Sequence, residues 1–249
     1  MPIQLPLAVL ADIHGNAAAL RAVLADAKAR GVTRFANLGD TFYGPLDPAA
    51  TWAILRGLAM PAVLGNQDRI LLEGGPAREA APALRAARDG IGPDGLAWLR
   101  SLPATLRLDG DVLLCHGTPR DDAAYLLEDV SSGRPAMRPC SAVLADLSPE
   151  ADGCTLVLAG HSHFPGRLDC GPATVVNPGS VGLPAYDDDL PPHAMASGSP
   201  HARYAIVERT PSGWDATFVA VAYDWDAAAA LAGRNGRADW ARWLASGLA

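Results

Sequence analysis

The sequence predicts an α/β protein in which mixed β-sheets are flanked by helices. Short apolar runs recur along the chain, and each is followed by a polar, glycine-containing loop and often by a helix-like segment, as in layered α/β proteins with buried strands. These runs occupy residues 5–11, 34–38, 61–64, 112–115 and 155–159. From residue 104 onward hairpin patterns take over, which predicts a second, mixed sheet in the later half.

The first unit is a strand over residues 5–11 followed by a helix over residues 16–30. Asn16 is suited to cap the start of this helix, and Gly31 is suited to end it. Apolar side chains recur at helical spacing along the segment: Leu20, Val23, Leu24 and Ala27. The sequence therefore predicts a strand, loop and helix unit at the start of the fold.

Two turn signals in the later half predict hairpins. The runs LRLDGDVLLC (106–115) and RLDCGPATVV (167–176) each place a turn between apolar segments. A final strand pair is expected at residues 203–208 and 215–222.

The remaining segments have less regular patterns. Residues 184–202 combine acids, prolines and small residues without a period, so we expect a surface loop or lid there. A tryptophan-containing helix is expected at about 226–246, within a C-terminal helical extension over 224–249. No internal repeat or domain boundary is evident, and we expect a single domain over residues 1–249.

Composition limits the partners of the protein. The 249 residues carry a formal net charge of -7 and have a pI near 5.3, which argues against a broad basic surface for nucleic acid or anionic lipid. A local phosphate site remains compatible with this charge, because bound divalent cations convert a carboxylate-lined pocket into an anion receptor. A small substrate is therefore favoured.

The cysteines and the hydropathy pattern predict a cytoplasmic protein. Cys115, Cys140, Cys154 and Cys170 show no Cys-x-x-Cys spacing, so we expect four reduced structural thiols and no zinc ribbon or redox motif. The chain starts without a positively charged, apolar leader pattern, and no apolar stretch is long enough for a membrane span.

Oxygen and imidazole donors follow almost every predicted strand. Because strand ends at one edge of a sheet point into a shared crevice, residues far apart in the sequence can converge there. A mixture of carboxylates and imidazoles suits manganese, iron or zinc better than calcium or magnesium. The donors are Asp12, His14, Asp40, Asn66, His116, His161 and His163.

The order of these motifs resembles the calcineurin-like metallophosphoesterase superfamily over residues 7–183. The motifs are Asp12-Ile13-His14, Gly39-Asp40, Gly65-Asn66, His116 and Gly160-His161-Ser162-His163. The closing run from Asn177 to Gly182 (NPGSVG) resembles its small bacterial and archaeal phosphoesterase branch. The resemblance implies a four-layer α/β/β/α sandwich of two mixed sheets flanked by helices, and a metal-dependent phosphoric ester hydrolase.

The resemblance also implies a role for each donor. Asp12, His14 and His163 would bind one metal ion, Asn66, His116 and His161 the other, and Asp40 would bridge both. The metals implied are manganese or iron, with zinc or nickel as alternatives, and a metal-bridging hydroxide would attack phosphorus. Catalytic roles then fall to Asp40, Asn66, Gln67 and His116.

Each motif taken alone also has a structural interpretation. Asn66 after Gly65 fits a turn, and Asp40 after Gly39 fits a helix cap. Cys115 precedes His116 on a strand, so alternation predicts that it faces the core. The Asn177-Pro178-Gly179-Ser180 turn either supports the site or contacts substrate, and the sequence leaves both interpretations open.

Two departures from the family pattern concern the substrate. Many relatives have a histidine where this chain has Gln67, and an amide cannot donate a proton to the leaving group. We therefore expect substrates with good leaving groups, unless His193 or His201 in the predicted lid supplies the proton. Asp68, which would pair with the family histidine, would instead orient Gln67 or another group behind the ligands.

The second departure is Leu183-Pro184, where many relatives have Pro-Arg. Arg120 and Arg69 are candidate replacements for the missing guanidinium, because the planar fork of arginine binds phosphate with two hydrogen bonds. The expected substrate contacts are then Asn66, Gln67 and Arg120.

The leading functional prediction is a dinuclear phosphodiesterase or phosphatase, with nucleotides such as diadenosine polyphosphates as candidate substrates by resemblance. A serine/threonine protein phosphatase is an alternative within the same superfamily. A non-catalytic metal-binding interaction module is an alternative from another class. The sequence does not identify the substrate, the metal pair or the oligomeric state.

Overall fold

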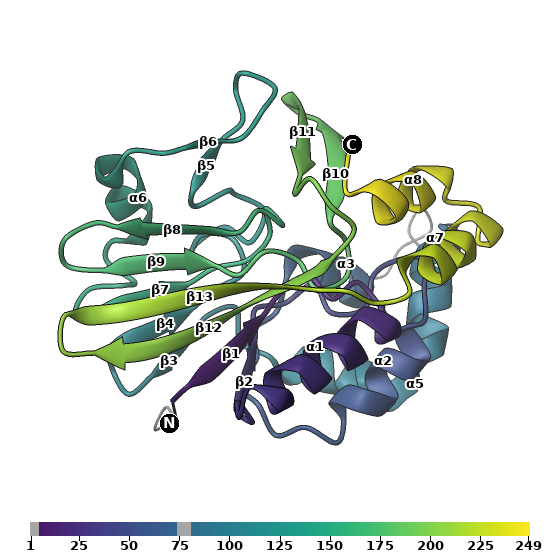
Figure 1. Ribbon diagram of the computed structural model, residues 1–249, viewed down its shortest axis with the longest axis horizontal. Helices are drawn as coiled ribbons and strands as arrows, with labels where there is room; N and C mark the ends of the chain where they lie inside the picture. Colours follow the sequence, from purple (N-terminus) through teal and green to yellow (C-terminus); the bar gives the residue numbers. More distant parts are fainter. Residues whose placement is uncertain (1–4, 74–80) are drawn as a thin grey trace.

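The computed structural model describes residues 5–73 and 81–249. Two β-sheets pack face to face (Figure 1). In the first sheet, β1 and β2 pair in parallel and the other neighbours are antiparallel. Its strand order is β13 (Gly213–Val221), β12 (Ala202–Thr210), β1 (Leu7–Leu10) and β2 (Phe35–Asn37).

The second sheet is also mixed, with β4, β7 and β9 parallel and β3 and β8 antiparallel at its edges. Its strand order is β3 (Leu106–Leu108), β4 (Val112–Leu114), β7 (Leu156–Leu158), β9 (Thr174–Asn177) and β8 (Gly166–Asp169). The apolar faces of the two sheets enclose one core, to which Val9, Leu114 and Val207 contribute.

Helices cover the outer face of each sheet. The second sheet is covered by α6 (Cys140–Leu147), whose Val143 and Leu147 pack against Val157. A larger group covers the first sheet: α1 (Ala17–Ala29), α2 (Pro48–Leu55), α3 (Asn66–Leu72) and α5 (Pro82–Ser101). The expected four-layer sandwich is confirmed, with a thinner helical layer on the second sheet.

The predicted caps of α1 are confirmed. The Asn16 side chain accepts a hydrogen bond from the backbone nitrogen of Ala19, and Gly31 is left-handed, with a φ of 81°. The amide of Gly31 donates to the Lys28 carbonyl and the amide of Val32 to the Ala27 carbonyl. These two bonds satisfy the last carbonyls of the helix.

The predicted hairpins are present as β3–β4, β8–β9 and β12–β13. The Asp109-Gly110 turn has positive φ at both residues, as a two-residue hairpin turn requires. Residues 61–64, expected to be a strand, contribute only the isolated bridge between Ala62 and Asn37.

Two expectations for the C-terminal part are wrong in detail. Residues 184–202 are not an irregular loop, because they contain the hairpin β10 (Ala185–Asp189) and β11 (Pro192–Ala196). The single helix expected at 226–246 is two helices, α7 (Trp225–Arg234) and α8 (Ala238–Ser246), because Gly236 adopts a φ of 79° between them. The hairpin and the helix pair lie at the same end of the molecule (Figure 1).

The prediction of four reduced cysteines is also wrong. Cys140 and Cys170 form a disulfide between α6 and the end of β8, whereas Cys115 and Cys154 are free and buried. Cys115 faces the core, as alternation predicted. Two short strands, β5 (Glu128–Asp129) and β6 (Ala136–Met137), pair with each other as a separate antiparallel sheet. Across residues 5–73 and 81–249, every helix is too short or too polar to span a bilayer.

Candidate metal centre

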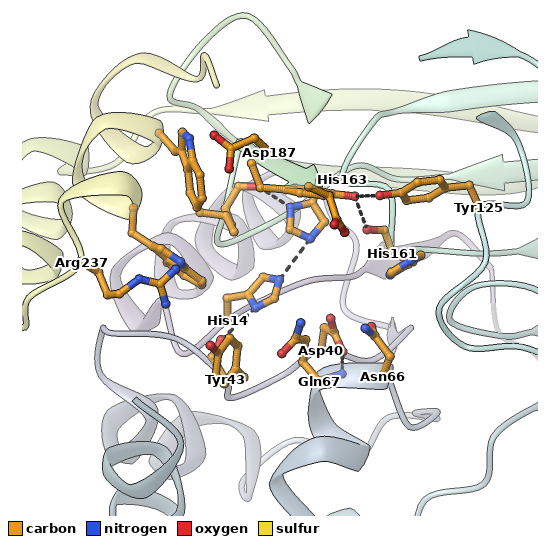
Figure 2. A pocket seen from close by; sticks show the side chains of 15 residues that line it. His14, Asp40, Tyr43, Asn66, Gln67, Tyr125, His161, His163, Asp187 and Arg237 are labelled. Carbon is orange, nitrogen blue, oxygen red and sulfur yellow. Dashed lines mark hydrogen bonds between the residues drawn. The ribbon is translucent and has the colours of Figure 1, made fainter. Parts of the chain in front are cut away.

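Six of the seven predicted donors lie in loops that follow strands, at one edge of the two sheets, and the seventh begins a helix. Asp12 and His14 follow β1, Asp40 follows β2, and Asn66 begins α3. His116 follows β4, and His161 and His163 follow β7. Figure 2 shows His14, His163 and His161 around one space, with Asp40 and Asn66 on its lower wall.

Most of these donors have a left-handed backbone, which L-residues adopt rarely and at a cost. Within the described chain, the hairpin residue Asp109 is the sole other non-glycine residue with positive φ. Strained backbone concentrates at functional sites, so this pattern marks the centre without any reference to residue type. The φ angles are 55° for Asp12, 51° for His14, 52° for Asp40, 70° for His161 and 59° for His163.

The first donor group is Asp12, His14 and His163, whose ligand atoms all lie within 4.8 Å of one another. The Nε2 atoms of His14 and His163 are 3.1 Å apart, and Nε2 of His163 is 3.4 Å from Oδ1 of Asp12. The Nδ1 atoms of the two rings lie 2.8 Å from the carbonyls of Tyr43 and Leu183. Because these carbonyls fix the proton on Nδ1, both Nε2 atoms present lone pairs to the same point.

The second donor group is Asp40, His116 and His161. Nε2 of His116 lies 3.4 Å from Oδ2 of Asp40 and 3.0 Å from Oδ1 of Asn66, so the Asn66 amide belongs to the same cluster. Nδ1 of His116 faces the Leu38 carbonyl at 2.7 Å. His161 differs, because its Nε2 contacts the Ala123 carbonyl at 2.9 Å, which leaves Nδ1 as its ligand atom.

The electrostatics of the centre favour a cation. Oδ1 of Asp12 is buried without a hydrogen-bond partner, which is costly for a carboxylate. Burial lowers the pKa of His14 and of His161 to about 4. Burial opposes the charge on His116 as well, but the Asp40 carboxylate outweighs it and raises the pKa of His116 to about 10. Without metal, the Asp40 carboxylate therefore lies beside a protonated His116. Divalent metal ions would replace this positive charge, so these residues fit a metal centre.

Buried hydrogen bonds hold the donor loops in register. Asp68 accepts hydrogen bonds from the amide and hydroxyl of Thr41, so it fixes the Asp40 loop and does not orient Gln67. The Asn177 amide donates to the Gly160 carbonyl at 2.7 Å, and the Ser180 hydroxyl donates to the Asp12 carbonyl at 2.8 Å. Of the two interpretations of the Asn177–Ser180 turn, these bonds favour support of the site.

A cavity of about 230 Å³ opens onto both donor groups. Figure 2 shows Gln67 beside Asp40, Tyr125 near His161, and Arg237 at the opposite side. Aromatic side chains from four segments contribute to its walls: Tyr43, Tyr125, Tyr186, Trp240 and Trp243. Sequence reasoning missed these residues, although the tryptophans of the C-terminal segment were visible in the sequence.

The arginines expected at the site lie elsewhere. Arg120 does not line the cavity and bonds to Glu150 and to the Ala145 and Ser148 carbonyls. Arg69 also lies outside the lining and pairs with Asp122 at 2.7 Å. Among the described residues, the arginine that lines the cavity is Arg237, between α7 and α8. The expectation of an Arg120 substrate contact is therefore corrected, because its guanidinium is already engaged on the surface.

The two candidate acids occupy different positions. His193 is buried, and its Nε2 lies 2.8 Å from the Tyr125 hydroxyl. Its Nδ1 faces the Pro191 carbonyl at 2.6 Å, so His193 reaches the cavity through Tyr125 and does not line it. His201 packs against Trp225 at a centroid distance of 5.1 Å and is also absent from the lining.

Comparison with known proteins identifies the family. A model of the calcineurin-like phosphoesterase superfamily domain matches residues 5–197. The chain belongs to this superfamily. It is therefore a metal-dependent phosphoric ester hydrolase, and the two donor groups are where such a phosphoesterase would hold divalent metal ions.

Individual proteins resemble this chain over most of its length. The uncharacterized protein MJ0912 of Methanocaldococcus jannaschii is 29% identical over 202 residues, which cover 72% of this chain and 76% of that protein. The crystal structure of a metallophosphoesterase from Sphaerobacter thermophilus has a TM-score of 0.72 at 26% identity and covers 97% of this chain and 99% of its own. The hypothetical protein PH1004 of Pyrococcus horikoshii OT3 shares the fold, with a TM-score of 0.76, 20% identity, and coverage of 97% and 98%.

Proposed function

We propose that this phosphoesterase is a dinuclear phosphodiesterase for small esters with good leaving groups. Asp12, His14 and His163 would hold one metal ion, Asn66, His116 and His161 would hold the other, and Asp40 would contribute to both, with manganese or iron as the preferred ions. The observation that carries the proposal is the pair of converging donor groups, each with ligand atoms within 4.8 Å of one another.

Divalent ions bound by these residues would activate water as the nucleophile and would neutralise the phosphoryl oxygens. The chain's own residues orient the ester. The backbone amide of Gln67 donates to Oδ1 of Asp40 at 2.8 Å, which fixes the carboxylate. The Gln67 side chain lines the cavity beside Asn66 and donates a hydrogen bond to a phosphoryl oxygen or to the leaving group.

Among the described residues, every histidine that lines the cavity belongs to one of the two donor groups. No cavity-lining histidine is therefore left to protonate the leaving group. Leaving groups that depart as stable anions therefore react fastest. Aryl phosphodiesters and the phosphoanhydride links of nucleotides, including diadenosine polyphosphates, have this property. The buried position of His193 leaves it at most an indirect role through Tyr125.

The test is hydrolysis of bis-p-nitrophenyl phosphate and p-nitrophenyl phosphate by metal-stripped protein, with manganese, iron(II), zinc or magnesium restored one at a time. Asp40→Asn is the test variant, and Asp89→Asn, at an exposed position of α5, is the matched control. We expect two metal ions per chain and metal-dependent cleavage of the diester, lost only in Asp40→Asn. Protein with two bound ions but no turnover of either ester would contradict the proposal, and selective turnover of a phosphoserine peptide would favour a protein phosphatase.

A further inference from the structure

Part of the cavity wall is built by a segment beyond the family domain. The family match ends at residue 197, whereas Arg237, Trp240 and Trp243 line the cavity together with the metal-centre histidines. These three residues lie at the start of α8 and along it, on the side of the cavity where Figure 2 shows Arg237. Arg237 and α8 therefore form part of the space that receives the ester.

This wall is fixed to the metal centre by close packing. The ring of Trp240 meets the ring of His14 edge-on at a centroid distance of 5.5 Å. A Cβ on Gly44 would lie 2.9 Å from the Trp240 ring and 2.6 Å from the His14 carbonyl, so only glycine permits this approach. The Asn235 amide also donates to the Pro45 carbonyl at 2.7 Å, between α7 and the same loop.

The wall presents aromatic faces and an unused hydrogen-bond donor. Tyr43 packs against Trp240 at 6.3 Å between centroids, and Trp243 lies 6.5 Å from Trp240. Trp243 is 5% exposed, and its Nε1 is buried without a hydrogen-bond partner. Buried indole N–H groups usually find an acceptor, so this donor is available to a bound molecule that reaches it.

A cation stands at the edge of the same wall. The Arg237 guanidinium lies 5.3 Å from the centroid of Trp240 and is held by Asp239, which accepts from its Nε at 2.9 Å and its Nη2 at 2.6 Å. This arrangement places a guanidinium plane, whose charge is balanced by Asp239, beside the Trp240 ring on the side opposite His161. Because Asp187 and Asp188 also line the cavity, this side offers a planar stacking surface and no net positive charge.

We propose that the wall formed by Tyr43, Arg237, Trp240 and Trp243 is a subsite for a planar aromatic group carried by the phosphate ester. The proposal rests on the proposed function, because the phosphoryl group at the metal centre sets the position of the ring. A cavity of about 230 Å³ is large enough for a phosphoryl group and one ring. A nucleobase and a simple aryl group share this chemistry.

The test compares two phosphonates that bind a metal centre alike but differ in one ring, phenylphosphonate and methylphosphonate. Their dissociation constants are measured by calorimetry on manganese-loaded protein, so the readout does not require turnover. We expect phenylphosphonate to bind about tenfold more tightly, because stacking on an aromatic side chain is worth a factor of this order. Trp240→Leu and Tyr43→Leu should each bring the ratio close to one while methylphosphonate still binds. Trp98→Leu, on α5 outside the cavity lining, should retain the ratio.

Adenosine monophosphate distinguishes the source of the ring. Trp243→Phe keeps a ring and removes the N–H. If adenosine monophosphate binds more tightly than phenylphosphonate and this binding is weakened in Trp243→Phe, the result supports a nucleobase. If phenylphosphonate binds more tightly than adenosine monophosphate and its binding is unchanged in Trp243→Phe, the result supports an aryl ester. A ratio near one in the unmodified protein, or an undiminished ratio in Trp240→Leu, would overturn the subsite. Ring-selective binding without ester hydrolysis would instead overturn the proposed function and leave the subsite standing.

Discussion

The Nε2 atoms of His14 and His163 face each other at 3.1 Å, although both rings direct Nδ1 at a backbone carbonyl. Two lone pairs at this separation repel unless a proton or a metal ion lies between them. The relationship therefore connects the stability of the fold to occupation of the metal centre.

Divalent metal should raise the melting temperature of the stripped protein. A ligand that binds only the folded state stabilises it by about 4 kcal/mol at a thousandfold excess over its dissociation constant. Calorimetric melting with and without manganese measures this gain. His14→Ala should lose most of it, whereas His201→Ala, outside the cavity lining, should keep it. Equal melting temperatures of stripped and manganese-loaded protein would count against metal binding at this site.

Replacement of Gln67 by histidine should extend the substrate range. A positioned imidazole protonates the leaving oxygen, and general acid catalysis typically contributes about 100-fold or more. We therefore expect Gln67→His to accelerate cleavage of alkyl esters strongly and of p-nitrophenyl esters little. Gln67→Asn, which keeps an amide, is the control. An equal acceleration of both ester classes would argue against a missing acid.

Gly44→Ala should disturb the contact between α8 and the metal centre. The added Cβ would lie 2.6 Å from the His14 carbonyl oxygen and 2.9 Å from the Trp240 ring, and overpacking of this kind costs about 1–3 kcal/mol. Urea unfolding measures the loss of stability. In the control Gly57→Ala the nearest atom to the new Cβ is the Ile54 carbonyl at 3.6 Å, so its stability should change little. An unchanged midpoint for Gly44→Ala would show that the wall is free to move.

Glu128→Gln should stabilise the protein at high pH. Glu128 is 5% exposed, and its burial outweighs the contact with Ser162 and raises its pKa from 4.5 to about 7. The folded state therefore holds a proton that the unfolded chain releases between these pH values, and the stability of the native protein falls as pH rises through this window. Above pH 7 the variant should be more stable by up to about 3 kcal/mol, since one pKa unit is worth about 1.36 kcal/mol.

The difference should vanish below pH 4.5, where both folded and unfolded chains hold the proton. Thermal melts from pH 4 to pH 9 measure this trend. Glu208→Gln, at an exposed position of β12, should show no such trend. A constant difference between Glu128→Gln and the native protein across the range would rule out the buried carboxyl as its cause.

The layered fold and the donor set could be predicted from the sequence because both depend on local patterns. Apolar runs such as residues 112–115 mark buried strands, and donors that directly follow them, such as His116, converge by topology. The hairpin β10–β11 was missed because Asp187–Asp189 and Pro191 interrupt any apolar alternation.

The rest of the cavity depends on contacts between distant segments. Asn235 and Pro45 are 190 residues apart in the sequence, and no pattern in either segment indicates that α8 reaches His14. The Cys140–Cys170 disulfide has the same origin, because only the packing of α6 against the second sheet brings the two residues together. Arg237 was overlooked for this reason, and Arg120 was preferred because it lies near His116 in the sequence.

Five of the seven donors have a left-handed backbone, which lowers the stability of the fold at the site where the chemistry takes place. Each such residue costs about 1 kcal/mol or more relative to a relaxed conformation. The total conformational cost of the five residues is therefore comparable with the lower end of a domain's net stability of about 5–15 kcal/mol. Glycine at these positions would relieve the strain, and under the proposed function it would also remove the metal-binding side chains. A variant selected for thermal stability alone would therefore be expected to lose these aspartate and histidine side chains first.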